Sequence, residues 1–390
     1  MKGLVFFDTS QVHAASKGFS GAACDGRYIY YVPMNNGTPS GQVTRYDSQG
    51  RFDDPASWSF FDTTTVHADS RGFTDGLFDG RYLYMVPYFN GLHHGQVTRY
   101  DTRAPFADPA SWCVFDTRQL DPESRGFVSG VVAGRHLYLA PYQLDWSTYH
   151  GRIVRYDTQA DFNTTTSWDI FDAARLQEGC QGYHSAVADG RHVYFVPYRG
   201  NKDFHGHLVR FDSQGRFDDP QAWTTFDLTT LHPQCRGFIG AVRTDRHLCF
   251  VPYYDGTDRH GQVARYEIGS RLDARTGWQV FDMARVHPNS RGFFGALFDQ
   301  RYIYFIPHCI EEGIYHGQVS RFDTTKPLDD LSAWAVCDTA RVYPLSKGYI
   351  GGVIVGRHLY MSPYETAPRA HTGVVVRIDL DEPSLWEYAR

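Results

Sequence analysis

The chain has 390 residues and a formal net charge of −6; 42% of the residues are hydrophobic and 21% are charged. This composition is that of an ordinary folded protein, and no apolar run approaches the roughly 20 residues that cross a bilayer, so wholesale disorder and a membrane-embedded protein are excluded. The mild acidity argues against a nucleic-acid partner, because a phosphate backbone is bound by a basic patch.

The beginning of the chain, Met1–Asp8, lacks the long apolar core and the small-residue cleavage site of a signal peptide. The seven cysteines are an odd number and no two have C-x-x-C spacing, so we expect neither a disulfide framework nor a zinc site made of cysteines. We therefore expect a cytoplasmic protein with no membrane partner.

One pattern fills the chain. The dipeptide Phe-Asp recurs every 54 to 56 residues, at Phe7-Asp8, Phe61-Asp62, Phe115-Asp116, Phe171-Asp172, Phe226-Asp227 and Phe281-Asp282, with Cys337-Asp338 in the seventh place. Tryptophan follows the same period, at Trp58, Trp112, Trp168, Trp223, Trp278, Trp334 and Trp386. Repetition at a fixed period indicates a repeat architecture.

Each repeat is expected to contain four short strands separated by turn signals. In the second repeat these are a strand between Arg71-Gly72-Phe73 and the turn Asp79-Gly80-Arg81, then Tyr82–Val86, Gly95–Asp101 and Trp112–Asp116. Pro87 ends the second strand, because proline cannot donate to a strand ladder. No segment has a sustained helical period.

Four antiparallel strands in each of seven repeats predict an all-β, seven-bladed β-propeller. We expect one propeller domain over residues 1–390, with repeats at about 9–62, 63–116, 117–172, 173–227, 228–282, 283–338 and 339–390. The C-terminal end carries Trp386 without Phe-Asp, and the N-terminal end carries Phe7-Asp8 without a tryptophan. The two ends are therefore expected to share one strand position, with residues 3–8 closing blade seven.

A Tyr-Asp pair followed by a tryptophan, as in Tyr100-Asp101 and Trp112, resembles the third and fourth strands of kelch repeats. The resemblance covers one hairpin per blade, and the glycine doublet of kelch repeats is absent. It implies the propeller architecture and no closer family.

Charged residues also recur in each repeat, and we interpret most of them as a network of Arg–carboxylate pairs that joins strands and blades. The alternative for the basic residue before each Gly-Phe or Gly-Tyr, among them Arg71 and Arg125, is a ring that attracts an anionic ligand. The repeated positions are Arg27, Arg81, Arg135, Arg191, Arg246, Arg301 and Arg357; Arg45, Arg99, Arg155, Arg210, Arg265, Arg321 and Arg377; and Lys17, Arg71, Arg125, Arg236, Arg291 and Lys347, with Gln181 as the exception.

Histidine precedes the third strand in five repeats, at His94, His150, His205, His260 and His316. Three of them, His94, His150 and His205, are candidate ligands for one divalent ion, because imidazole suits Mn, Fe, Ni or Zn. The alternative is a structural histidine that bonds to the neighbouring blade once per repeat. The repetition favours the structural alternative.

Departures from the repeat are the better indicators of a site. The two positions after Gly-Phe or Gly-Tyr are apolar, small or glycine in four blades, but blades two to four have Thr74-Asp75, Val128-Ser129 and His184-Ser185. Blade four also replaces the basic residue by Gln181. We expect Asp75, Ser129, His184, Ser185 and Gln181 to lie together near the central channel, on the face that carries the variable loops.

The variable loop of blade three is also unusual, because its Trp146 is the one tryptophan outside the period. A loop tryptophan such as this is either a stacking platform for a ligand or an anchor packed on the next blade. With Tyr149 of the same loop, it is a candidate contact for a ligand.

These observations favour an enzyme with a small-molecule or saccharide site at the channel mouth. Asp75 and His184 are the candidate acid/base residues, and Arg71, Arg125, Gln181, Ser129, Ser185, Trp146 and Tyr149 are the candidate ligand contacts. The architecture is similar to that of seven-bladed, metal-dependent polysaccharide lyases, which implies lyase- or isomerase-like chemistry. The alternatives are a multivalent lectin-like module and a protein-interaction platform without catalysis.

Overall fold

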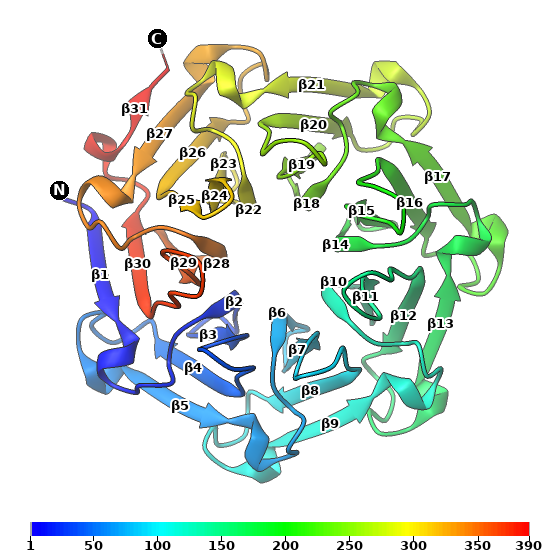
Figure 1. The fold of residues 1–390 in the computed structure, drawn as a ribbon, viewed down its shortest axis with the longest axis horizontal. Helices are drawn as coiled ribbons and strands as arrows, with labels where there is room; N and C mark the ends of the chain where they lie inside the picture. The colour runs from blue at the N-terminus through cyan, green and yellow to red at the C-terminus, as the bar shows by residue number, and fades with distance from the viewer. Residues whose placement is uncertain (1, 390) are drawn as a thin grey trace.

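Residues 2–389 are described by a computed structural model, and they form seven antiparallel sheets arranged as blades around a central axis (Figure 1). The predicted all-β, seven-bladed propeller is therefore confirmed. No helix in the described part of the chain is long and apolar enough to cross a membrane.

The strands of the first four blades run from the axis outward in chain order. They are β2 (Phe19–Cys24), β3 (Tyr28–Pro33), β4 (Gln42–Asp47) and β5 (Trp58–Asp62); β6 (Phe73–Phe78), β7 (Tyr82–Pro87), β8 (Gln96–Asp101) and β9 (Trp112–Asp116); β10 (Phe127–Ala133), β11 (His136–Pro141), β12 (Arg152–Asp157) and β13 (Trp168–Asp172); and β14 (Tyr183–Ala188), β15 (His192–Pro197), β16 (His207–Asp212) and β17 (Trp223–Asp227).

The last three blades include both ends of the described chain. They are β18 (Phe238–Arg243), β19 (His247–Pro252), β20 (Gln262–Glu267) and β21 (Trp278–Asp282); β22 (Phe293–Phe298), β23 (Tyr302–Pro307), β26 (Gln318–Asp323), β27 (Trp334–Asp338) and β31 (Glu387–Tyr388); and β28 (Tyr349–Val355), β29 (His358–Pro363), β30 (Val374–Asp379) and β1 (Leu4–Asp8). A small hairpin of β24 (Cys309–Glu311) and β25 (Ile314–Tyr315) forms the loop of blade six.

Short 3₁₀ turns flank the outermost strands. Those after an outer strand are Thr9–Gln11, Thr63–Thr65, Thr117–Gln119, Ala173–Arg175, Leu228–Thr230, Met283–Arg285 and Thr339–Arg341. Those before an outer-strand tryptophan are Pro55–Ser57, Pro109–Ser111, Thr165–Ser167, Pro220–Ala222, Arg275–Gly277, Leu331–Ala333 and Pro383–Leu385.

The N-terminal strand closes the ring. β1 pairs antiparallel with β30, with Phe6 opposite Val376, and so supplies the outermost strand of blade seven. The C-terminal end differs from the expectation that the two ends share this position. Because β1 already covers the edge of β30, β31 pairs with β27 of blade six instead, with Tyr388 opposite Ala335. Figure 1 shows β1 and β31 on the same side of the ring.

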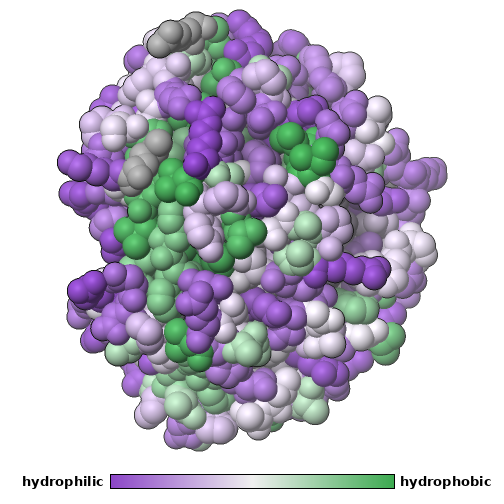
Figure 2. Space-filling view, turned by 60° about the vertical axis from the view of Figure 1, so that its left-hand side comes forward, coloured by the Kyte–Doolittle hydropathy of each residue, from purple (hydrophilic) through white to green (hydrophobic). Residues whose placement is uncertain are grey.

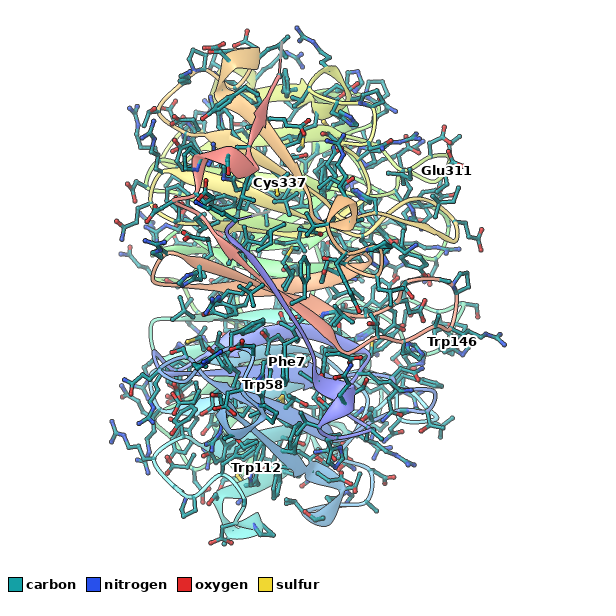
Figure 3. All side chains as sticks on the ribbon, turned by 90° about the vertical axis from the view of Figure 1, so that its left-hand side faces the viewer. Phe7, Trp58, Trp112, Trp146, Glu311 and Cys337 are labelled. Atoms are coloured by element: carbon teal, nitrogen blue, oxygen red, sulfur yellow. The ribbon has the colours of Figure 1, made fainter. Side chains whose placement is uncertain are left out.

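Aromatic stacking joins each blade to the next. The phenylalanine of each Phe-Asp lies nearly parallel to the tryptophan of the following blade, and Figure 3 shows Phe7 on β1 beside Trp58. The ring centroids are 4.8 Å apart in Phe7–Trp58, 4.6 Å in Phe61–Trp112, 4.5 Å in Phe115–Trp168, 4.1 Å in Phe171–Trp223, 5.5 Å in Phe226–Trp278 and 5.1 Å in Phe281–Trp334. The repeated pair is therefore an interface between blades.

The repeated charges are used in three different ways. The arginine after each turn pairs with an acid at the end of the third strand in all seven blades, as in Arg27 with Asp47 at 2.6 Å. The aspartate of each Phe-Asp instead caps the following 3₁₀ turn, as Asp62 does by accepting from the Thr64 amide. The arginine on the third strand mostly stacks on an aromatic ring of the next blade, as Arg45 does on Phe106 at 4.1 Å.

The side of the ring that carries β1 is the one brought forward in Figure 2, where hydrophobic side chains gather in a strip between hydrophilic ones. Leu4, Val5, Phe6 and Phe7 of β1 are all half-buried. The strand is therefore held both by the ladder with β30 and by apolar contacts on its two faces.

Deleting residues 1–8 is expected to lower the melting temperature of the whole ring, because β30 loses its partner and Trp58 loses Phe7. The single change Phe7→Ala should lower the free energy of unfolding by about 2–4 kcal/mol, measured by urea denaturation. The matched control Leu92→Ala, at a side chain that is 74% exposed, should change it by less than about 0.5 kcal/mol. An unchanged melting temperature in the truncated chain would contradict closure by β1.

Candidate functional site

The seven innermost strands surround the channel, and each has a register irregularity just after its first residue. Such bulges turn side chains away from the regular pleat, here at the two positions where the repeats differ. At the second position Gly21, Gly295 and Gly351 have φ of 79°, 113° and 69°, a backbone conformation that excludes most side chains. The same position in blades two to five has no positive φ.

A cavity of about 330 Å³ opens at the channel mouth. Its wall is polar on one side and apolar on the other. It is lined by Ser20, Gly21, Met34, Thr74, Asp75, Tyr88, Val128, Ser129, Tyr142, His184, Ser185, Tyr198, Ile239, Gly240, Ala241, Tyr253, Phe294, Gly295, Ala296, Ile350 and Gly351. Four of the predicted site residues, Asp75, Ser129, His184 and Ser185, are brought together here.

Asp75 is the only acidic side chain of this wall within the described residues. Its Oδ2 accepts a hydrogen bond from Ser129 Oγ at 2.5 Å, and its Oδ1 accepts from the Gly76 amide at 2.8 Å. Ser129 Oγ lies 3.4 Å from Ser185 Oγ, so a chain of polar groups crosses blades two, three and four. Desolvation by burial outweighs these hydrogen bonds and raises the pKa of Asp75 to about 6.

His184 lies in the same wall and is held by blade five. Its Nδ1 is 2.9 Å from the carbonyl oxygen of Ile239, which requires an Nδ1–H donor and leaves Nε2 as an acceptor. Its ring meets Tyr198 and Phe294 edge to face, each at 5.2 Å between centroids. Burial lowers the pKa of His184 to about 3, so its imidazole is neutral over the physiological range.

Four tyrosines form a collar above these residues, one from each of blades two to five. Each follows the proline that ends the second strand, and neighbouring ring centroids are 6.3, 6.0 and 6.2 Å apart along Tyr88, Tyr142, Tyr198 and Tyr253. The Tyr88 hydroxyl donates to Gln143 Oε1 at 2.6 Å. We did not predict this collar from the sequence, where its only signal is the Pro-Tyr dipeptide shared by these blades.

The blade-three loop lies beside the mouth, outside the cavity lining. Trp146 is 65% exposed and packs against His93 of blade two, with centroids 4.9 Å apart, and against Phe89 at 5.0 Å. It is thus anchored on one side and open on the other, and Figure 3 places it on the same face as Glu311. Tyr149 is buried and its hydroxyl accepts from Gln143, so it supports the collar from behind.

The repeated histidines occupy equivalent places within their blades. Nδ1 of His94, His150, His205 and His260 accepts from the backbone amide two residues later. His205 also bonds through Nε2 to the carbonyl oxygen of Gln181 at 2.7 Å. Burial lowers the pKa of His94 to about 4 and that of His150 to about 3. In residues 2–389, no three His, Cys, Asp or Glu side chains gather as a metal site would require.

The basic residues before Gly-Phe stand around the mouth without lining the cavity. Nε of Arg71 and of Arg125 is buried and has no hydrogen-bond partner in the described part of the protein. Two equivalent arginines face loop acids: Arg236 lies 3.8 Å from Asp203, and Arg291 lies 3.5 Å from Glu311. Gln181 belongs to a separate cleft, described below.

No family model matches the sequence, and no curated protein matches it. A solved structure of PorZ, an essential bacterial surface component of the type-IX secretion system of Porphyromonas gingivalis, is similar with a TM-score of 0.55 and 12% sequence identity. The similarity covers 96% of this chain and 38% of that chain. At this level of identity the likeness shows the fold alone, and the chain stands as a seven-bladed β-propeller with a cavity at the channel mouth.

Asp75→Asn is expected to stabilise the protein at pH 8 and to have little effect at pH 4. A raised pKa means that the protonated carboxyl favours the folded state; this contribution is complete below about pH 4 and is lost as the pH rises through about 6. The amide keeps an oxygen acceptor for Ser129 and removes the charge. Urea denaturation should show a gain of about 1–2 kcal/mol at pH 8.

The control is Leu92→Ala, at a side chain that is 74% exposed and has no titratable group, which should change stability equally at the two pH values. A gain for Asp75→Asn that is as large at pH 4 as at pH 8 would contradict the raised pKa.

Proposed function

We propose that this protein binds one small molecule or saccharide unit at the channel mouth and that Asp75 performs acid/base chemistry on it, in a lyase- or isomerase-like reaction. The observation that carries the proposal is the position of Asp75. It is a partly buried carboxyl group at the wall of a cavity, and its pKa is raised to about 6. A group with a pKa near the working pH both takes and returns a proton efficiently.

The shape of the cavity supports a ligand with one apolar face and one polar edge. Ile239, Phe294 and Ile350 of blades five to seven offer apolar surfaces, while Asp75, Ser129 and Ser185 of blades two to four offer hydrogen bonds on the opposing arc. A pyranose ring has such a pair of surfaces, and so do many small metabolites. The volume of about 330 Å³ is at the lower end of ligand pockets and suits a single unit.

The neighbouring side chains take distinct roles in this proposal. Ser129 donates to Asp75 and so favours the ionised carboxylate against the desolvation that raises its pKa. Ser185 extends the chain of hydroxyls, with its Oγ 3.4 Å from Ser129 Oγ, and offers a further hydrogen bond to the ligand. His184, neutral and fixed by Ile239, presents Nε2 as an acceptor for a ligand hydroxyl.

A metal ion held by His94, His150 and His205 remains a prediction, and the proposed proton transfer does not require it. If the prediction holds, elemental analysis of the purified, tag-free protein will find about one Mn, Fe, Ni or Zn ion per chain, and His150→Gln will remove it. No ion after chelation and soaking with these four metals would contradict the prediction and leave the histidines as structural residues of the blades.

We also infer a cytoplasmic protein without nucleic-acid or membrane partners. All seven cysteines are free thiols, which supports a reducing compartment. The net charge of −6 supports the absence of a nucleic-acid partner.

A protein-binding role for the same face is the second candidate. It is favoured by two large exposed apolar side chains on adjacent loops, Leu92 at 74% and Trp146 at 65%. Substitutions inside the channel would leave such an interaction unchanged, whereas Trp146→Ser would weaken it. The two candidates are therefore separable by the same set of variants.

Gly240→Phe is expected to abolish ligand binding by filling the channel mouth. No described atom lies within 4 Å of the position that a Cβ on Gly240 would take, and its φ is not positive, so the side chain enters the cavity without strain. A library of metabolites and monosaccharides, screened by ligand-observed NMR, should yield binders to the native protein that are lost in Gly240→Phe. Products formed from a binder should disappear in Asp75→Asn.

The control for that screen is Leu92→Ala, which leaves the cavity intact. Binders that persist in Gly240→Phe would place the site elsewhere, and turnover that persists in Asp75→Asn would exclude this carboxyl group as the acid/base residue. Melting curves of each variant show whether the ring is still folded.

A further inference from the structure

Blade four carries a second, separate cleft on the face of the variable loops, with a volume of about 700 Å³. It lies between the segment that precedes β14 and the loop that precedes β16. The cleft is lined by polar side chains and one phenylalanine, and its residues are not those of the channel mouth.

The cleft arises where blade four departs from the repeat. In blades one and two an asparagine of the loop bridges to the segment before the first strand: Asn36 Nδ2 donates to the Ala15 carbonyl oxygen, and Asn90 Nδ2 to that of Asp69. In blade five Gln234 and Asp255 make the same connection through their side chains.

In blade four the two ends of this bridge are Gly179 and Gly200, so the asparagine bridge of blades one and two has no counterpart at these positions. The third departure is Gln181, which replaces the Lys or Arg of the other six repeats. A Cβ on Gly200 would lie 3.6 Å from Gln181 Cγ and 3.6 Å from His205 Cδ2, which places these groups on the opposite wall. Three substitutions that each remove bulk therefore meet at one place.

Two hydrogen-bonding side chains remain free in this cleft. The Gln181 carboxamide and the His207 imidazole have no side-chain hydrogen bond within the part of the chain that the structure describes, while the rings of His205 and His207 stack at 5.5 Å. The charges at the rim are paired: Lys202 Nζ lies 2.6 Å from Glu178 Oε1, and Asp203 lies 3.8 Å from Arg236. Phe204 adds an aromatic surface.

From this juxtaposition we propose that the blade-four cleft is a binding site for a neutral saccharide. A carboxamide and an imidazole both form hydrogen bonds with hydroxyl groups such as those of a sugar, and an aromatic ring packs on its C–H face. A charged ligand would meet no unpaired opposite charge here. The site is single, because the other blades carry a bridge or a basic side chain at these positions.

The Lys202–Glu178 pair crosses the rim and does not block the cleft. Both side chains are more than four-fifths exposed, and an ion pair in that setting contributes little to stability. A saccharide that enters displaces this pair at small cost.

The test restores the repeat in blade four. Gly200→Asn together with Gln181→Arg rebuilds the residues of blade two without entering the channel, and the backbone of Gly200 has no positive φ to forbid it. The probes are maltotriose, cellotriose and mannotriose, titrated against the full chain and followed by saturation-transfer NMR. At least one should bind the native protein, and the double variant should weaken that binding about tenfold or more.

Two controls separate this site from the channel. The matched control Asn90→Gly with Arg71→Gln makes the reverse change in blade two and should leave binding unaltered, as should Gly240→Phe. The proposal is overturned if none of the three sugars binds at about 10 mM, or if binding survives the double variant. Loss of binding in Gly240→Phe alone would place the sugar in the channel and would also overturn it. A melting curve confirms that each variant is folded.

Discussion

The contact on which the ring depends is the stacking of each phenylalanine of an outer strand on the tryptophan of the following blade. An aromatic pair of this kind contributes about 0.5–1.5 kcal/mol beyond the apolar area that it buries, and six such pairs repeat around the ring. They fix the angle between neighbouring blades at the outer rim. The innermost strands are consequently positioned by contacts far from the axis, and their channel residues are free to differ.

The seventh junction, between blades six and seven, is built differently. Cys337 stands where the other blades have phenylalanine, and Trp386, which packs in the same core cluster, arrives from the C-terminal end of the described chain. Arg321 of blade six lies over the Trp386 ring at 4.1 Å. This junction therefore lacks the phenylalanine–tryptophan stack but keeps the arginine–aromatic contact of the other blades, and the Trp386 ring also lies 5.6 Å from that of Tyr304 between centroids. Strands β1 and β31 reinforce it by adding strands to blades seven and six.

The repeat made most of the fold predictable, because strands, turns and closure each have a local signal. The residues Pro87, Gly95 and Trp112 mark strand ends that the structure reproduces within one residue. The placement of β31 had no such signal, since it depends on which strand edge remains uncovered after β1 has paired. The capping role of Asp62 and its equivalents was also missed, because a three-residue 3₁₀ turn has too short a period to be visible in a sequence.

Part of the candidate site was predictable because its residues depart from the repeat at one position of the innermost strand. Asp75, Ser129, His184 and Ser185 differ from their repeat partners on one strand, and strand position alone brings them to the cavity. Gln181 also differs, but its surroundings are set by Gly179 and Gly200 on two loops, and the distance between loops is not encoded in the repeat. The tyrosine collar has no signal in the sequence beyond a Pro-Tyr dipeptide that blade seven also has, and a shared dipeptide is not a departure from the repeat.

Two features coincide on the same four blades, and this coincidence supports the proposal of a ligand site at the channel mouth. Blades two to five have no left-handed backbone at the second channel position, so they can carry side chains there, whereas Gly21, Gly295 and Gly351 require glycine. Blades two to five are also those in which the residue after the proline is a tyrosine that lines the cavity; blades one and six have Met34 and His308 there, and Tyr364 of blade seven is not part of the lining. The first feature belongs to the innermost strand and the second to the end of the next strand, so neither one determines the other. Random divergence among repeats gives no reason for the backbone conformation and the cavity-lining tyrosines to be shared by the same blades. A ligand that contacts blades two to five would explain why they are.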